Sequence, residues 1–170
     1  MGSKPLLSTH FNNPDYRAYA PSVDAVPNPE NYLPMEPLPH ILLVDDDDTT
    51  NFVNETLLNK LQVSAQVRVA TSGEEALALL TQPPPYVPTL LLLDVAMPGM
   101  GGIAFLEAYG RLPPAQQAAT VIVVLTTSMD SRDLGRIDDL PIAGLVSKPL
   151  NREKIDTLLQ LHFQRQLPGA

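Results

Sequence analysis

Short runs of apolar residues alternate with amphipathic stretches along most of the chain, from residue 40 onward. Several of these runs are continuously apolar, which is typical of strands buried on both faces of a parallel sheet. In residues 65–70 apolar and polar side chains alternate, as they do in a strand with one face turned to solvent. The pattern predicts five strands, over residues 40–44, 65–70, 89–93, 120–125 and 142–146.

Between the strands, apolar side chains recur three and four residues apart, which is the spacing of one face of a helix. In the first of these stretches Val53 and Leu57 follow this spacing and are expected to face the core. The stretch near 130–138 contains Gly135 and few apolar residues, so a weak and mobile helix is expected there. The predicted helices cover residues 49–61, 72–80, 102–112, 130–138 and 151–163.

Strands that alternate with helices predict an α/β fold in which a doubly wound parallel sheet is connected by right-handed crossovers. The expected sheet has five parallel strands in the order 2-1-3-4-5, with five helices on its faces. In this order the first strand, over 40–44, lies beside the third strand, over 89–93. Polar residues that follow these two strands are therefore brought to the same edge of the sheet.

The first 38 residues differ from the rest of the chain in their proline content. Because proline is poorly tolerated in long helices and central strands, residues 1–38 are expected to be a mostly flexible extension. A domain is expected over 39–165, followed by a short tail over 166–170. Aromatic residues are scarce in disordered tails, so a second hypothesis is that part of the extension docks on the domain or on a partner. The extension holds four aromatics: Phe11, Tyr16, Tyr19 and Tyr32.

Composition narrows the classes of function that the chain can have. Its 170 residues, of which 44% are hydrophobic, suffice for one globular domain with an extension. There is no cysteine, which excludes disulfides, thiolate zinc sites and cysteine nucleophiles. A net charge of -8 argues against DNA or RNA as a direct partner. The sequence contains neither an apolar stretch long enough to span a bilayer nor a signal peptide. We therefore expect a cytoplasmic location and no membrane insertion.

Charged residues stand directly after the predicted strands or one residue beyond them, where ligands of open α/β sheets bind. Asp45 and Asp46 follow the first strand, Asp94 follows the third, and Lys148 follows the fifth. Crowded carboxylates repel one another, and a bound cation offsets that cost. Oxygen ligands without His or Cys suit Mg²⁺ or Mn²⁺. With Lys148 and the Thr126 hydroxyl to stabilise phosphoryl oxygens, one carboxylate could act as a nucleophile toward phosphorus.

Four segments that contain these residues resemble the signatures of response-regulator receiver domains. They are Ile-Leu-Leu-Val-Asp-Asp at 41–46, Leu-Leu-Leu-Leu-Asp-Val-Ala-Met-Pro-Gly-Met-Gly-Gly at 90–102, Val-Val-Leu-Thr at 123–126 and Ser-Lys-Pro-Leu at 147–150. Each segment alone is a weak signal, but all four occur in order and at suitable spacing. The resemblance covers about residues 38–165 and implies a flavodoxin-like fold.

The resemblance implies specific roles for the acidic residues. Asp94 corresponds to the phosphoacceptor, and Asp46 and Asp94 correspond to direct ligands of Mg²⁺. Asp45 is expected to hold the metal mainly through water, and Ala96 is expected to offer its backbone carbonyl. Ala96 also leaves space near the phosphoryl group where many receivers carry a polar side chain, which is expected to change the rate of dephosphorylation.

Three further positions correspond to the residues that bind phosphate and switch the surface. Thr126 matches the switch hydroxyl, and Lys148 matches the lysine that pairs with the phosphoryl group. The peptide bond from Lys148 to Pro149 is expected to be cis, a form that proline makes accessible. Receivers usually carry Tyr or Phe three residues before this lysine, whereas this chain has Leu145. Coupling between the site and the output surface is therefore expected to be weaker or different.

The expected function is that of a stand-alone response regulator in a two-component or phosphorelay system. A sensor histidine kinase or a histidine phosphotransfer protein would phosphorylate Asp94. No attached output domain is expected after residue 170, so output is expected through the face formed by the fourth helix, the fifth strand and the fifth helix. The cognate kinase, the stimulus, the downstream target and the oligomeric state are not encoded in any recognisable motif.

Two other functions fit parts of the same pattern. Asp45-x-Asp47-x-Thr49 after a strand resembles the nucleophile motif of haloacid-dehalogenase-type phosphatases. That function would leave Asp94 without a role, and the remaining length has no room for a cap domain. The other alternative is a receiver-like interaction module that is no longer phosphorylated. This alternative stays open because Leu145 replaces the aromatic residue that receivers usually carry.

Overall fold

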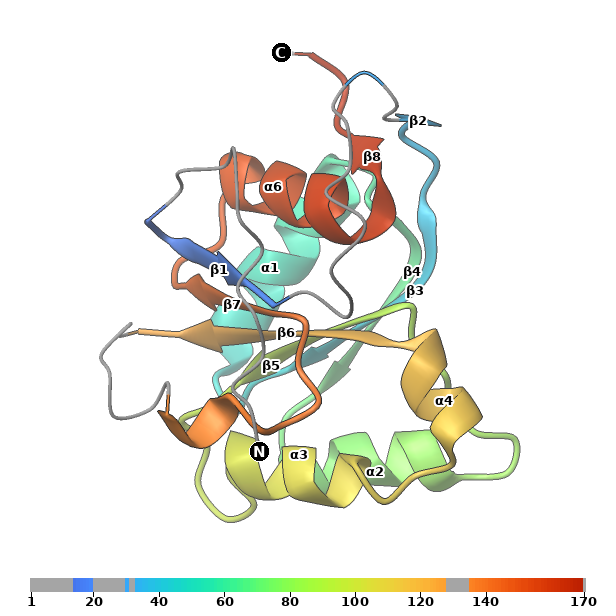
Figure 1. The fold of residues 1–170 in the computed structure, drawn as a ribbon, viewed down its shortest axis with the longest axis vertical. Helices are drawn as coiled ribbons and strands as arrows, with labels where there is room; N and C mark the ends of the chain where they lie inside the picture. Colours follow the sequence, from blue (N-terminus) through green and yellow to red (C-terminus); the bar gives the residue numbers. More distant parts are fainter. Residues whose placement is uncertain (1–13, 20–29, 31–32, 128–134, 170) are drawn as a thin grey trace.

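The computed structural model describes residues 14–19, 30, 33–127 and 135–169, and these form a sheet covered by helices on both faces (Figure 1). Five parallel strands make up most of the sheet, in the spatial order β4-β3-β5-β6-β7. This is the predicted order 2-1-3-4-5, and the α/β doubly wound fold is confirmed. These strands are β3 (Leu38–Val44), β4 (Ser64–Ala70), β5 (Leu90–Asp94), β6 (Val121–Thr126) and β7 (Gly144–Ser147).

The main sheet has one strand more than the five predicted, because the N-terminal extension adds a sixth strand to it. This strand, β1 (Tyr16–Ala18), pairs antiparallel with the outer side of β7. A separate two-stranded parallel sheet joins β2 (Leu33–Pro34) to β8 (Arg165–Gln166). Proline in the extension did not prevent β1, because the three residues of this edge strand contain none.

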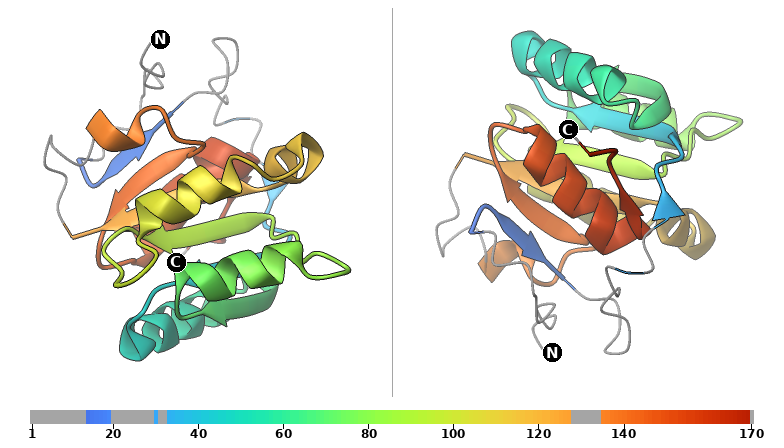
Figure 2. Two further views of the ribbon diagram at one scale, coloured as in Figure 1. Left: turned by 90° about the horizontal axis from the view of Figure 1, so that it is seen from below. Right: turned by 90° about the horizontal axis from the view of Figure 1, so that it is seen from above.

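The helices form two layers, one on each face of the sheet (Figure 2). Residues 135–137 are also helical, whereas most of the helix predicted over 130–138 lies outside the described residues. One helix, α4, was not predicted, although it has a proline in its first turn, a position at which proline favours helix initiation. The named helices are α1 (Asp48–Lys60), α2 (Gly73–Thr81), α3 (Gly102–Tyr109), α4 (Pro114–Ala119) and α6 (Arg152–Phe163).

Alternate side chains of the central strands point to opposite faces and build two apolar layers. Leu91 and Leu93 of β5 face α2 and α3, where they pack with Phe105. Leu90 and Leu92 face α1 and α6, where they pack with Leu58 among others. All four leucines of β5 are buried, as expected for a strand in the middle of a doubly wound sheet. No helix within the described parts of the chain has the length and apolar character needed to cross a bilayer.

The β1 strand is fixed to the domain by main-chain and side-chain hydrogen bonds. The Ser147 N–H donates to the Asp15 carbonyl at 3.0 Å, and the Tyr19 N–H donates to the Ala143 carbonyl at 2.8 Å. The Tyr16 hydroxyl lies 2.6 Å from Nε2 of His162 on α6. Burial raises the pKa of Tyr16 and lowers the pKa of His162 to about 4, so this hydrogen bond joins a neutral phenol to a neutral imidazole at neutral pH.

The C-terminal residues also pack against the domain. Leu167 is buried, and its N–H donates to Oδ1 of Asp156 on α6 at 2.8 Å. The chain turns back at Gln164, which has a positive φ of 53°. The segment predicted as a tail over 166–170 therefore includes at least one core residue.

Candidate functional site

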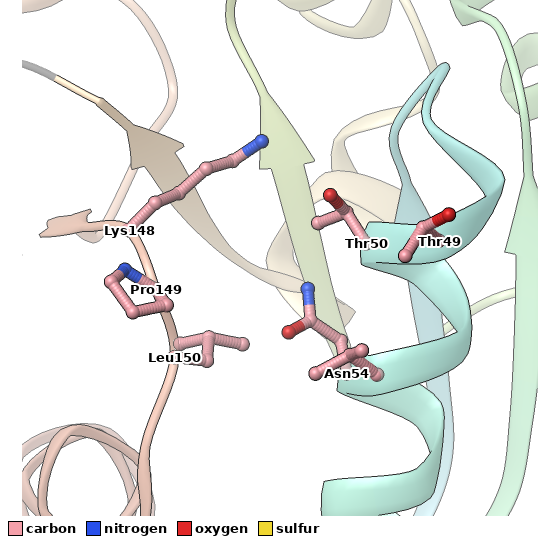
Figure 3. A pocket seen from close by; sticks show the side chains of 7 residues that line it. Thr49, Thr50, Asn54, Lys148, Pro149 and Leu150 are labelled. Carbon is pink, nitrogen blue, oxygen red and sulfur yellow. The ribbon is translucent and has the colours of Figure 1, made fainter.

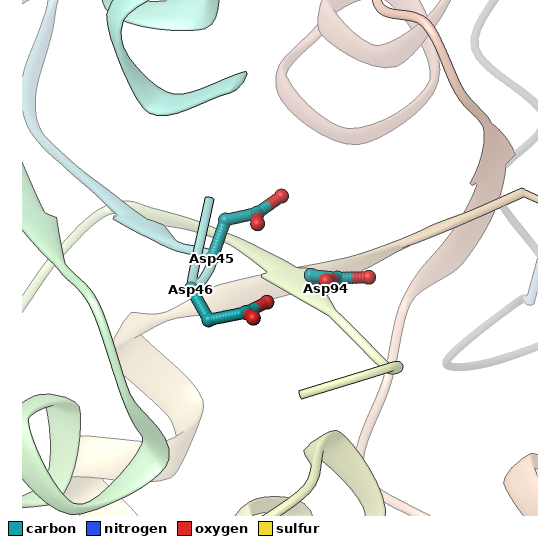
Figure 4. A group of neighbouring side chains, drawn as sticks. All are labelled: Asp45, Asp46 and Asp94. Carbon is teal, nitrogen blue, oxygen red and sulfur yellow. The ribbon is translucent and has the colours of Figure 1, made fainter. Parts of the chain in front are cut away.

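Three carboxylates meet at the carboxyl ends of β3 and β5. Asp45 and Asp46 follow β3 directly, and Asp94 is the last residue of β5. Because these strands are hydrogen-bonded neighbours, each of the three side chains offers an oxygen within 4.8 Å of the other two (Figure 4). Asp45 and Asp94 are buried, whereas Asp46 is exposed. The structure thus brings together the acids that the sequence predicted.

The ammonium of Lys148 bridges the two buried carboxylates. Its Nζ lies 2.7 Å from Oδ2 of Asp45 and 3.4 Å from Oδ1 of Asp94. Lys148 follows β7 directly, and its side chain is 18% exposed. One ammonium among three carboxylates leaves an excess of negative charge, which attracts a further cation.

The charges of the site shift one another's protonation. Burial raises the pKa of Asp94, the charge of Lys148 opposes this shift, and the charge of Asp45 adds to it. For Lys148, burial lowers the pKa, but the hydrogen bond to Asp45 and the charges of both acids outweigh burial and raise it. Lys148 is therefore charged at neutral pH. For Asp94, burial is the largest of these effects, so its negative charge is less well stabilised here than on a free carboxyl group.

The main chain around the first acid is fixed by side chains of α1. Asp45 Oδ1 accepts a hydrogen bond from the Asp47 N–H at 2.9 Å. Asp47 caps the helix by accepting from the Thr50 N–H at 2.7 Å, and this bond lowers the pKa of Asp47. Asn51, which is buried, donates from Nδ2 to the Asp45 carbonyl at 2.7 Å. Asn51 was not predicted as a site residue, because the burial of an asparagine cannot be read from the sequence.

A close packing contact fixes the main chain around Asp94. The Ala96 N–H donates to Asp94 Oδ1 at 3.2 Å. Gly102, the first residue of α3, lies against this segment so closely that an added Cβ would meet Val95 Cα at 2.7 Å and the Asp94 carbonyl oxygen at 2.9 Å. Only glycine fits here without movement of the backbone. No sequence signal distinguished Gly102 from the preceding Gly101.

Of the remaining predicted positions, Thr126 and Pro149 lie at the same edge of the sheet, whereas Leu145 lies within a strand. Thr126 ends β6, and its carbonyl accepts from the Lys148 N–H at 2.7 Å. The peptide bond between Lys148 and Pro149 is cis. Leu145 is buried in the middle of β7, where it pairs with Arg17 of β1 on its outer side. Ala96 is exposed, two residues beyond Asp94.

A shallow pocket of about 200 Å³ lies beside Lys148 (Figure 3). One wall is the first two turns of α1, from Thr49 to Asn54, and the other is the segment 148–150. Phe52 and Val53 on α1 are 68% and 53% exposed. The prediction that Val53 faces the core is therefore wrong, because the buried side of α1 is lined by Asn51, Asn54 and Leu58 instead.

Comparisons with known proteins agree with this arrangement. The family described as the response regulator receiver domain matches residues 41–160. A probable chemotaxis protein CheY from Rhizobium etli is 29% identical over 123 residues, which cover 72% of this chain and 91% of that protein. A two-component response regulator from Cytophaga hutchinsonii is similar in structure, with a TM-score of 0.65 and 26% identity over 74% of this chain and 96% of that chain.

A second solved structure, a response regulator receiver protein from Dyadobacter fermentans, is 31% identical with a TM-score of 0.63. The similarity covers 71% of this chain and 94% of that chain. The matched region contains all three carboxylates of the cluster and Lys148. The chain therefore belongs to the response regulator receiver domain family, whose members are signalling proteins of two-component systems.

Proposed function

We propose that Asp94 accepts a phosphoryl group from a phosphohistidine on a sensor kinase or a phosphotransfer protein, in the presence of Mg²⁺. The observation that carries this proposal is the cluster of three carboxylates within 4.8 Å of one another, with the Lys148 ammonium 3.4 Å from Asp94. The donor set fits the metal, because carboxylate oxygens without nearby nitrogen or sulfur ligands suit a hard divalent cation. Asp45, Asp46, Asp94 and the backbone carbonyl of Ala96 would hold it.

The proposed transfer forms one bond and breaks one. A carboxylate oxygen of Asp94 attacks phosphorus, the phosphorus–nitrogen bond of the phosphohistidine breaks, and the released imidazole nitrogen takes up a proton from water. Bound Mg²⁺ would neutralise charge on the phosphoryl oxygens and offset the repulsion between the acids. Lys148 pairs with one phosphoryl oxygen, and the Thr126 hydroxyl donates to another. Both groups lie at the ends of strands that follow Asp94 in the sheet.

Phosphorylation would change the surface that a downstream protein binds. A single phosphoryl group biases a switch effectively only when its two states differ by a few kcal/mol. The predicted output face comprises β7, α6 and the helical segment that includes residues 135–137. Because β1 lies along β7, this face also includes residues 16–18 of the extension. Leu145, buried in β7, would transmit the change without an aromatic ring.

The metal requirement of the proposal can be measured directly. Replacing Asp46 by Asn is expected to weaken Mg²⁺ binding about tenfold or more, because an anionic oxygen ligand becomes a neutral amide. Isothermal titration calorimetry with Mg²⁺ measures the affinity, and labelling by acetyl phosphate with and without EDTA tests whether transfer needs the metal. Asp48→Asn is the matched control, since Asp48 is also an exposed aspartate but lies outside the cluster. Equal affinities in both variants would contradict the assigned ligand set.

We propose further that the phosphodonor protein docks on α1. Phe52 and Val53 are exposed on this helix, and Val53 also lines the pocket beside Lys148. A protein that brings a phosphohistidine to Asp94 would cover these apolar side chains. Since the aromatic residue at such a contact often carries much of the binding energy, we expect Phe52→Ser to slow transfer from the protein donor about tenfold.

The docking experiment uses a phosphorylated phosphotransfer protein that labels the unchanged chain. Acetyl phosphate serves as the internal control, because a small donor does not need α1 and should label the Phe52→Ser variant at the normal rate. Asn59→Ser, at the exposed far end of α1, is the matched variant and should behave like the unchanged chain with both donors. If Phe52→Ser slows labelling equally with both donors, Phe52 supports the fold of the chain and does not contact the phosphodonor protein.

A further inference from the structure

A buried lysine, Lys154, lies behind the site in the first turn of α6. It is 6% exposed, and its ammonium donates three hydrogen bonds, to the Ser147 carbonyl at 2.9 Å, the Ser147 hydroxyl at 3.2 Å and the Pro149 carbonyl at 3.0 Å. An ammonium has three donors, so all of them are used. Among the described residues, no carboxylate forms an ion pair with it.

The burial of this charge is costly in the absence of a counter-ion. Removing an ammonium from water costs several kcal/mol, which hydrogen bonds to neutral oxygens offset only in part. An apolar side chain of similar length would avoid the cost and fill the same space. Stability alone therefore gives a poor reason for a lysine at position 154.

The acceptors of Lys154 indicate a different reason. They belong to Ser147 and Pro149, the residues immediately before and after Lys148. The Lys148 N–H in turn donates to the Thr126 carbonyl at 2.7 Å. The main chain on both sides of Lys148 is therefore fixed, by Lys154 from α6 and by Thr126 from β6.

A fixed main chain matters for Lys148 because its side chain has four rotatable bonds. Its ammonium has to lie between Asp45 and Asp94, at 2.7 and 3.4 Å. A movement of the turn would displace the Nζ atom, and groups that act on a reacting centre lose effect when they are misplaced by about 1 Å. The Ser147 hydroxyl extends the same network, since it also bonds Oδ1 of Asp15 at 3.1 Å.

We propose that Lys154 is a positioning residue for Lys148: its hydrogen bonds to Ser147 and Pro149 hold the turn that directs the Lys148 ammonium between Asp45 and Asp94. The consequence for phosphoryl transfer rests on the proposed function, whereas the placement of Lys148 does not. Lys154 touches neither the carboxylates nor a phosphoryl group. It acts only through the position of Lys148.

The test compares two variants. Lys154→Met keeps about the length of the side chain but removes its charge and its hydrogen-bond donors, whereas Lys154→Arg keeps the charge and the donors. In the full chain with Mg²⁺ and acetyl phosphate, Lys154→Met is expected to lower the maximal labelling rate about tenfold without weakening Mg²⁺ binding. Lys154→Arg should recover a large part of the rate. Lys60→Met removes an exposed lysine from α1 and should change nothing. The carbon-13 resonance of Lys148 Cε, which reports the surroundings of its ammonium, should shift in Lys154→Met only.

The outcomes separate this inference from the proposed function. A Lys148 resonance that is unchanged in Lys154→Met would overturn the inference, whatever the labelling rate. A shifted resonance with a normal labelling rate would support the placement of Lys148 by Lys154 and overturn only the consequence for phosphoryl transfer. If the unchanged chain takes no label, the proposed function fails, and the resonance alone still decides whether Lys154 places Lys148. Should Lys154→Met fail to fold by circular dichroism, Lys154→Gln, which keeps a polar group too short to reach both carbonyls, is measured in its place.

Discussion

Replacing Asp94 by Asn is expected to reduce labelling by acetyl phosphate below detection, a loss of about 10²-fold or more. An amide is not nucleophilic toward phosphorus, so no acyl phosphate can form at this position. The fold should survive, because Asn has nearly the same shape and the Ala96 N–H can still donate to its carbonyl oxygen. Mass spectrometry of the intact chain after incubation with acetyl phosphate and Mg²⁺ measures the added phosphoryl group.

The same experiment distinguishes the receiver from a phosphatase of the haloacid-dehalogenase type. In that enzyme Asp45 would be the nucleophile, and its replacement by Asn would abolish labelling while Asp94→Asn would have no effect. In the receiver, Asp45→Asn weakens the metal site but leaves the acceptor in place, so slow labelling of Asp94 should remain. If the unchanged protein takes no label, neither substitution can have an effect. The chain would then be an interaction module with the receiver fold.

Gly102→Ala is expected to destabilise the folded chain by about 1–3 kcal/mol, the usual cost of adding a methyl group to a packed site. The added Cβ would lie 2.7 Å from Val95 Cα and 2.9 Å from the Asp94 carbonyl oxygen. Both are backbone atoms, so the strain cannot be relieved by turning a side chain. Either α3 or the end of β5 has to move, and movement of β5 displaces Asp94. We therefore expect slower labelling by acetyl phosphate as well.

The adjacent glycine provides the matched control. A Cβ on Gly101 would have its nearest neighbour at 3.6 Å, which is an ordinary van der Waals contact. Gly101→Ala should therefore leave the urea midpoint of unfolding and the labelling rate near those of the unchanged chain. Similar urea midpoints for the two variants would show that the close approach of α3 to β5 does not constrain the site.

The strand order and the convergence of the acids could be predicted because both follow from local patterns. Continuous apolar runs identify buried parallel strands, and right-handed crossovers leave few ways to order them. Once β3 and β5 are neighbours, Asp45 and Asp94 must lie at the same edge, since each follows its strand directly. The right-handed crossover was the only rule about distant segments that this prediction needed.

Other features depend on contacts between distant segments, which a pattern of residues does not reveal. The pairing of Tyr16 with Val146 joins residues 130 positions apart, and the three residues of β1 carry no clear strand signal. Val53 has the spacing of a core residue, but nothing in the chain indicates that the inner side of α1 is partly polar. Lys154 appears in the sequence as an ordinary surface lysine, and only its hydrogen bonds distinguish it.

The antiparallel strand β1 has one more consequence, which concerns self-association. An outer strand with unpaired main-chain groups is a template for aggregation with another chain. Residues 16–18 of the same molecule cover β7 and become the edge themselves, but a strand of three residues offers few main-chain groups for pairing. The opposite boundary of the described sheet is β4, whose exposed side chains include Gln66 and the charged Arg68. A charge on an outer strand discourages edge-to-edge pairing, so the molecule limits one route to fibres with a very short edge strand and the other with a guanidinium.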